Sequence, residues 1–244
     1  MKSLLAATVI GFQLVGTGFS QATTVLYTTD FPGTATQPGD WTVIDGGTVT
    51  GTGVGWRIDD NGAYRYQNPD TGINALSHYT GPLEGGIAYN ELTDFTIEAT
   101  VRRSSGSVVG LAGRISTSNT YYHARIINVS SIPRLQLYKF VGGSPAVQLG
   151  SNVTLDPTYV ADAAWRLVMD FNGTTISAYA YDESNTLAAS IVVTDSSIAS
   201  GSAGVRAQGT GRYESFTISI VPEPSSALLA GLGLLGAAAV RRRI

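Results

Sequence analysis

The sequence predicts an all-β protein, an antiparallel sandwich of two stacked sheets in a jelly-roll arrangement. Three observations predict it. Apolar and polar residues alternate with a period of two in many short segments, turn residues separate these segments, and no stretch between the two ends shows a sustained helical period. The 244-residue chain leaves about 200 residues between its hydrophobic ends, which suits one sandwich around one core.

The clearest strand lies at 94–102, where apolar residues from Phe95 to Val101 alternate with polar ones. Two further alternating runs, 165–171 and 174–181, flank Asn172-Gly173. That pair predicts a hairpin with a type I′ turn, because both central positions of this turn require positive φ. We expect the other strands at 25–28, 41–44, 54–58, 73–79, 108–115, 121–128, 135–140, 187–194, 203–207 and 213–220.

Composition excludes several functional classes. The chain has no cysteine, which rules out disulfides, thiolate-ligated zinc and a cysteine nucleophile. Charged residues make up 14% of the chain and the formal net charge is −3, so no basic footprint for nucleic acid is present. There are two histidines, His78 and His123, and the G-x-S-x-G elbow of many hydrolases is missing, so a hydrolytic triad is not indicated.

The N-terminal segment predicts export. Lys2 is followed by an apolar stretch from Leu4 to Val15 and by small residues that end at Ala22, the layout of a secretory signal cut before Thr23. We therefore expect a signal peptide at 1–22 and the β domain at 23–220. A retained membrane anchor or a buried strand is the alternative for the first segment.

The last 24 residues combine three ordered features: a Pro-Glu-Pro turn, an apolar run at about 225–240 that suits a short membrane helix, and a terminal arginine cluster. The residues concerned are Pro222, Glu223, Pro224, Arg241, Arg242 and Arg243. Residues 221–244 resemble the PEP-CTERM sorting signal. The resemblance implies recognition by an exosortase-type membrane protease. It also implies inner-membrane tethering with the domain on the periplasmic side, and later transfer to the cell surface or extracellular matrix.

The region from Asp30 to Ile220 resembles bacterial LamG-like, concanavalin A-like domains. Eight short segments follow one another in the same order, at 29–31, 40–43, 95–99, 110–114, 121–126, 165–167, 201–206 and 214–218. The resemblance implies a jelly roll and a carbohydrate-binding or adhesive role. It also implies one Ca²⁺ held by an acidic residue on the first strand and another on the last, here Asp30 and Glu214. The last position is usually Asp in this family, so Glu214 departs from the pattern.

Four residues are candidates for ligand binding. Tyr121, His123 and Arg125 share one face of a strand, and aromatic rings beside polar groups suit a sugar. The simpler alternative for His123 is a half-exposed strand histidine. Glu98 is the fourth candidate. It lacks the alternating acidic partners of a glycosidase strand, and a cross-strand ion pair with Arg125 or Arg114 is its simpler role.

The leading functional hypothesis is an exported, non-catalytic carbohydrate-binding or adhesive module that is sorted by its tail. Its partners would be the protease, the membrane through the C-terminal helix, and a polysaccharide, with Ca²⁺ as the one candidate cofactor. A secreted glycan-active hydrolase with carboxylates assembled from separate strands is the alternative. A passive surface component is a third possibility.

Overall fold

The computed structural model describes residues 23–33, 37–49, 53–70, 74–103, 107–129, 132–155 and 162–220. All of them belong to one compact unit, Thr23–Val221. The predicted signal peptide and the sorting tail with its membrane helix lie outside the described residues. Within the described ranges, no helix is long and apolar enough to span a membrane.

The described residues form fifteen strands and one 3₁₀ helix, η1 (Glu84–Gly86). The strands are β1 (Thr24–Thr29), β2 (Trp41–Asp45), β3 (Gly55–Ile58), β4 (Tyr64–Gln67), β5 (Asn74–Tyr79), β6 (Phe95–Arg103), β7 (Val108–Thr117), β8 (Thr120–Val129), β9 (Ile132–Phe140), β10 (Val147–Thr154), β11 (Ala164–Asn172), β12 (Thr175–Tyr181), β13 (Leu187–Thr194), β14 (Ser202–Gln208) and β15 (Gly211–Ile220).

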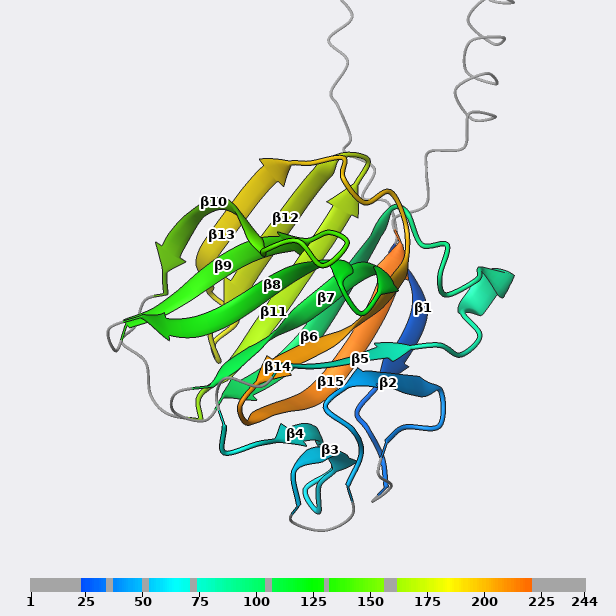
Figure 1. The fold of residues 1–244 in the computed structure, drawn as a ribbon, viewed down its shortest axis with the longest axis vertical. Helices are drawn as coiled ribbons and strands as arrows, with labels where there is room; N and C mark the ends of the chain where they lie inside the picture. The colour runs from blue at the N-terminus through cyan, green and yellow to red at the C-terminus, as the bar shows by residue number, and fades with distance from the viewer. Residues whose placement is uncertain are drawn as a thin grey trace, which may run out of the picture. The chain divides into compact units, whose positions relative to one another are not determined.

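These strands build two sheets, which confirms the predicted antiparallel sandwich (Figure 1). One sheet has eight strands in the order β13-β12-β11-β6-β15-β4-β3, with β1 paired to β15. The other has seven strands in the order β10-β9-β8-β7-β14-β5-β2. Figure 1 shows β7, β8 and β9 of the second sheet lying across β6, β11 and β12 of the first.

Period-two alternation decides which side chains enter the core between the sheets. On β6 the residues from Phe95 to Val101 alternate between buried apolar and half-buried polar positions. On β8 the core receives Tyr122, Ala124 and Ile126. Burying one such large apolar side chain contributes about 1.5–3 kcal/mol. The residues between them are therefore left on the two outer faces of the sandwich.

Two strands were not predicted from the sequence. β4 has four residues and follows the Asn61-Gly62 turn, so its alternation, with Tyr64 and Tyr66 buried, is too short to stand out. β10 is an edge strand that is exposed at most positions. Its pairing with β9 shifts register around Gly150, which has a φ of 71°. An edge strand that is exposed at most positions and contains a bulge buries too little to show the alternation that identifies a strand.

The hairpin between β11 and β12 was predicted correctly, but its turn was placed one residue early. Asn172 is the last residue of β11 and pairs with Thr175, so the two-residue loop is Gly173-Thr174. Gly173 has a φ of 56°, whereas Thr174 is not among the described residues with positive φ. A glycine at the first central position indicates a type II′ turn instead of type I′. Asp94 fixes the turn, because its carboxylate accepts a 2.6 Å hydrogen bond from the Gly173 N–H.

Candidate functional site

The outer face of the seven-stranded sheet contains a layer of aromatic and polar side chains built from β8, β9 and β14. We call it the arginine–aromatic layer, and it consists of Tyr121, His123, Arg125, Arg134, Gln136, Tyr138, Phe140 and Arg206. The antiparallel register of β8 and β9 places Tyr121 opposite Phe140, His123 opposite Tyr138 and Arg125 opposite Gln136. Three of the sequence-predicted residues, Tyr121, His123 and Arg125, are thus together in this layer.

Tyr121 forms the apolar end of the layer. Its ring stacks on Phe140 with the centroids 4.6 Å apart. It also belongs to a small apolar cluster on this outer face with Leu76 and Ala112. This cluster leaves Tyr121 only 4% exposed, and Phe140 is the ring that remains half-buried. Phe140 was not singled out in the sequence, although its place at the end of an alternating run was visible.

His123 is fully buried, so the expectation of a half-exposed strand histidine was wrong. Its Nδ1 accepts a 3.0 Å hydrogen bond from Nη1 of Arg206, while its Nε2 is buried without a partner among the described residues. Burial, and then the charges of Arg206 and Arg125, hold the pKa of His123 well below its ordinary value of 6.5. His123 is therefore a neutral acceptor that orients Arg206 and is shielded from solvent.

Arg125 is held in place by an amide network. Its Nε donates to Oε1 of Gln136 at 2.8 Å, and its guanidinium carbon lies 4.2 Å from the centroid of the Tyr138 ring. Gln136 in turn donates to Oδ1 of Asn152 at 2.9 Å, and the same oxygen accepts from Gln148 at 2.8 Å. Two restraints on one guanidinium group fix its plane before any ligand arrives.

Glu98 does not lie with the other three candidates. It projects from β6 on the outer face of the eight-stranded sheet, on the opposite side of the core. Its carboxylate forms a 2.8 Å ion pair with Nη1 of Arg166, so the predicted pairing with Arg125 or Arg114 was wrong. The register explains the partner, because Glu98 pairs with Val168 on β11, two residues from Arg166 on the same face.

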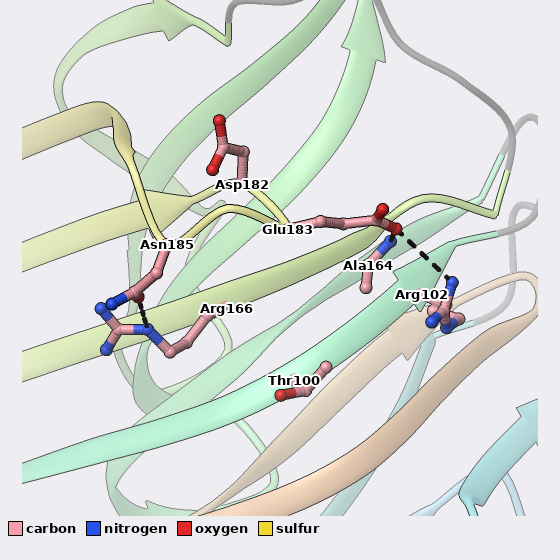
Figure 2. Close-up of a pocket in the computed structure, with 7 residues that line it drawn as sticks. All are labelled: Thr100, Arg102, Ala164, Arg166, Asp182, Glu183 and Asn185. Carbon is pink, nitrogen blue, oxygen red and sulfur yellow. Dashed lines mark hydrogen bonds and ion pairs between the residues drawn. The ribbon is translucent and has the colours of Figure 1, made fainter.

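A pocket of about 390 Å³ lies beside this pair (Figure 2). Thr100, Arg102, Ala164, Arg166, Asp182, Glu183 and Asn185 line it. Its charged groups already have partners within the protein. Arg102 Nε contacts Glu214 at 2.6 Å, and Glu183 accepts a 2.9 Å hydrogen bond from the Ala164 N–H. Figure 2 shows Asn185 reaching Arg166, whose Nε donates to it at 2.8 Å.

Asp30 and Glu214 are the acidic pair that the family resemblance implied for Ca²⁺. Asp30 directly follows β1 and is exposed, while Glu214 is engaged by Arg102. Ca²⁺ requires six to eight oxygen ligands. Among the residues that the structure describes, no group of three or more His, Asp or Glu side chains is placed to hold a metal.

Comparison with known proteins places the fold among lectin-type sandwiches. The CBM2 module of the evolved Dit of Lactobacillus casei BL23 phage J-1 has a TM-score of 0.59 at 12% identity, covering 82% of this chain and 96% of that one. The carbohydrate-binding module CBM66 from Bacillus subtilis has a TM-score of 0.51 at 16% identity, covering 71% and 91%. The exoplasmic/lumenal domain of VIP36 in its Ca²⁺-bound form has a TM-score of 0.51 at 11% identity, covering 73% and 82%. These likenesses show the fold alone.

The C-terminal segment has its own match. Residues 221–243 match the PEP-CTERM protein-sorting motif, which confirms the resemblance seen in the sequence. This motif marks an exported protein that is sorted to the cell envelope. No curated protein matches the chain by sequence. The protein thus combines a two-sheet β-sandwich with a C-terminal PEP-CTERM sorting motif.

Proposed function

We propose that this protein is a non-catalytic carbohydrate-binding module of the cell envelope or extracellular matrix, which binds polysaccharide through the arginine–aromatic layer. The layer itself is the observation that supports this most directly. It presents the half-buried rings of Tyr138 and Phe140 beside oriented amide and guanidinium donors. Sugar sites commonly combine ring surfaces with a few fixed polar groups. The sandwich fold, which CBM66 and a CBM2 module share, agrees with this role.

Binding is favoured over hydrolysis by the state of the carboxylates. A glycosidase requires two carboxyl groups flanking the scissile bond, about 5–10 Å apart. In the pocket of the eight-stranded sheet, Glu183 is held by the Ala164 N–H. Asp182 accepts hydrogen bonds from Ser184 and Thr186 in its own turn. The hydrogen bond from the Ser184 side chain, and then the backbone N–H groups, lower the pKa of Asp182. A general acid has to hold a proton near neutral pH, so a lowered pKa opposes that role.

Glycan-array binding of the full chain, purified in mild detergent, tests the proposal. Tyr138 and Tyr181 form a matched pair, because each lies on an outer face under an arginine guanidinium. We expect Tyr138→Ala to weaken binding about tenfold, as for loss of one anchor worth about 1.4 kcal/mol. Tyr181→Ala should leave it unchanged. Absence of binding to any glycan, or equal losses in both variants, would contradict the proposal.

A parallel array in the presence of a chelator addresses calcium. We expect binding to persist, because Glu214 is engaged by Arg102. Loss of binding that Ca²⁺ restores would instead point to a metal site that includes other residues.

We also propose that an exosortase-type protease removes the tail during transfer from the inner membrane to the surface. The match of residues 221–243 to the sorting motif supports this step. Intact mass spectrometry of the exported protein is the direct measurement. A form that lacks about 20 C-terminal residues is expected for a processed sorting segment, and recovery of the uncut chain at the cell surface would contradict cleavage.

A further inference from the structure

Cationic residues outnumber carboxylates in the strands of both sheets, by six to three in the eight-stranded sheet. The β domain, residues 23–220, has 11 basic and 17 acidic residues. The strands of the seven-stranded sheet nevertheless contain five cationic residues and a single carboxylate, Asp45, at the end of the edge strand β2. The five are Arg114, Arg125, Arg134, Lys139 and Arg206. Carboxylates are thus scarcest in the seven-stranded sheet, and the partners of its five cations decide whether their charge is available to a ligand.

Two of these five residues have structural roles. Arg114 points inward, where it donates to the carbonyl oxygens of Thr93, Ile198 and Gly173. Lys139 forms a 2.5 Å ion pair with Asp195. Neither is part of the arginine–aromatic layer, which leaves three cations on the outer face.

The three outward arginines have no carboxylate partner within ion-pair distance among the described residues. Arg125 contacts Gln136 and the Tyr138 ring, as described above. Arg206 is 3% exposed and contacts His123, Asn74 and the Phe140 ring. Its Nε is buried without a partner among the residues that the structure describes, and burial lowers the pKa of the Arg206 guanidinium. Partly desolvated cations without a counter-ion are unfavourable unless an anion completes the site.

The arrangement of Arg125 and Arg134 suits a chain of repeated anions. Arg125 lies opposite Gln136 of β9. Arg134 is two residues before Gln136 in the chain and lies on the same face of β9. Such diagonal neighbours are about 7–8 Å apart. With its Nε held by Gln136, Arg125 retains its Nη donors in a fixed plane and without a carboxylate partner among the described residues. This planar fork matches a carboxylate.

We propose that the arginine–aromatic layer recognises an acidic polysaccharide whose sugars bear carboxylates, with Arg125 and Arg134 contacting the carboxylates and the rings of Tyr138 and Phe140 contacting the sugar faces. This inference rests on the proposed carbohydrate-binding function and names the chemical class of its ligand. Arg206, oriented by His123, supplies positive potential from beneath these contacts.

Binding of the full chain to polygalacturonate, compared with its fully methyl-esterified form in the presence of a chelator, tests the inference. The two polymers share a backbone and differ in the charge of the carboxyl groups. We expect polygalacturonate to bind at least about tenfold more tightly, with the difference shrinking as salt rises. Arg125→Gln and Arg134→Gln should each weaken binding about tenfold, because a charge-assisted hydrogen bond contributes about 1.5–3 kcal/mol.

Arg166→Gln is the matched control. Arg166 also stacks on a tyrosine of an outer face, but it is paired with Glu98 and lies on the other sheet. We expect this variant to bind as the wild type does. Thermal unfolding of all three variants separates lost binding from lost folding, and the comparison of the two polymers on the wild-type chain requires no variant.

Each other outcome overturns the inference in a recognisable way. Equal binding of both polymers, or of neutral glycans only, would contradict acidic recognition and leave the proposed function standing. Binding to no glycan at all would contradict both. An equal loss in Arg166→Gln would show that overall charge, and not this layer, drives binding. Equal affinity for single-stranded DNA would show that the layer binds polyanions without selecting polysaccharide.

Discussion

Each outer face of the sandwich carries an arginine stacked on a tyrosine ring, but the second partner of the arginine differs between the two faces. On the eight-stranded sheet, Arg166 lies 3.8 Å from the Tyr181 ring and is neutralised by Glu98. On the seven-stranded sheet, Arg125 lies 4.2 Å from the Tyr138 ring and its Nε is held by the uncharged amide of Gln136. The stacked arginine of the first face is thus neutralised by a carboxylate, whereas the stacked arginine of the second face keeps its positive charge.

This difference teaches that a stacked arginine does not by itself mark a binding site. What distinguishes the two faces is the second partner of each guanidinium group. A carboxylate completes the charge, while an amide fixes the geometry and leaves the charge in place. Three experiments sharpen the comparison, from the largest expected effect to the smallest.

The largest effect is expected at the floor of the arginine–aromatic layer. A Cβ added at Gly110 would lie 2.2 Å from the backbone oxygen of Ala124 and 2.6 Å from Nε2 of His123. Because a backbone carbonyl within a sheet cannot move aside, Gly110→Ala should lower the free energy of unfolding by about 3 kcal/mol. Chemical denaturation measures this change.

Gly39→Ala is the control, since a Cβ there has no atom within 4 Å. It should change stability by less than about 1 kcal/mol. An unchanged stability in Gly110→Ala would show that the layer is loosely packed.

The pH dependence of stability should come from the seven-stranded sheet, which contains both histidines. Burial lowers the pKa of His78 to about 4. Burial is also the main reason that the pKa of His123 lies well below 6.5. Below pH 6.5 the two histidines bind protons in the unfolded chain but remain neutral in the folded chain. Stability therefore falls as the pH is lowered. Denaturation at pH 7.5 and 5.5 should show a loss of about 2–3 kcal/mol, because each histidine contributes about 1.3 kcal/mol.

His123→Gln should flatten this dependence, because Gln does not titrate and its carbonyl oxygen can still accept from Arg206. His78→Gln should flatten it by a similar amount, because a pKa of about 4 leaves His78 neutral in the folded chain at pH 5.5 as well. A wild-type stability that does not change over this pH range would contradict the assignment of both histidines as neutral.

The smallest effect concerns the two arginine–tyrosine stacks. Double-mutant cycles with Arg125→Gln and Tyr138→Ala, and with Arg166→Gln and Tyr181→Ala, measure each coupling energy. We expect about 1 kcal/mol for the more desolvated Arg125 stack and about 0.5 kcal/mol for the Arg166 stack. The reverse order would mean that the ion pair with Glu98 strengthens stacking more than burial does.

The fold was largely predictable because alternation and turn residues are local signals. The run from Phe95 to Val101 and the Gly173 hairpin both appear in the sequence as they do in the structure, apart from the one-residue position of the turn. β10 escaped prediction because an exposed edge strand with a bulge at Gly150 buries too little to impose a pattern.

The site was predictable only along single strands. Tyr121, His123 and Arg125 share a face because they are two residues apart, and alternation within β8 is enough to show it. Arg206 was not foreseen as the partner of His123, since the two are 83 residues apart in sequence. Glu98 was grouped with them wrongly, because sequence position does not tell to which of two sheets a strand belongs.

The sequence by itself determined the alternating strands, the all-β class and the sorting motif at the C-terminus, because each depends on residues that are near neighbours in the chain. Only the tertiary structure decided which arginines meet a carboxylate and which meet an amide, because those contacts depend on strand order and register across the two sheets. One arginine was thereby neutralised by Glu98 and another kept its charge beside half-buried aromatic rings, although both lie on strands of the same alternating kind.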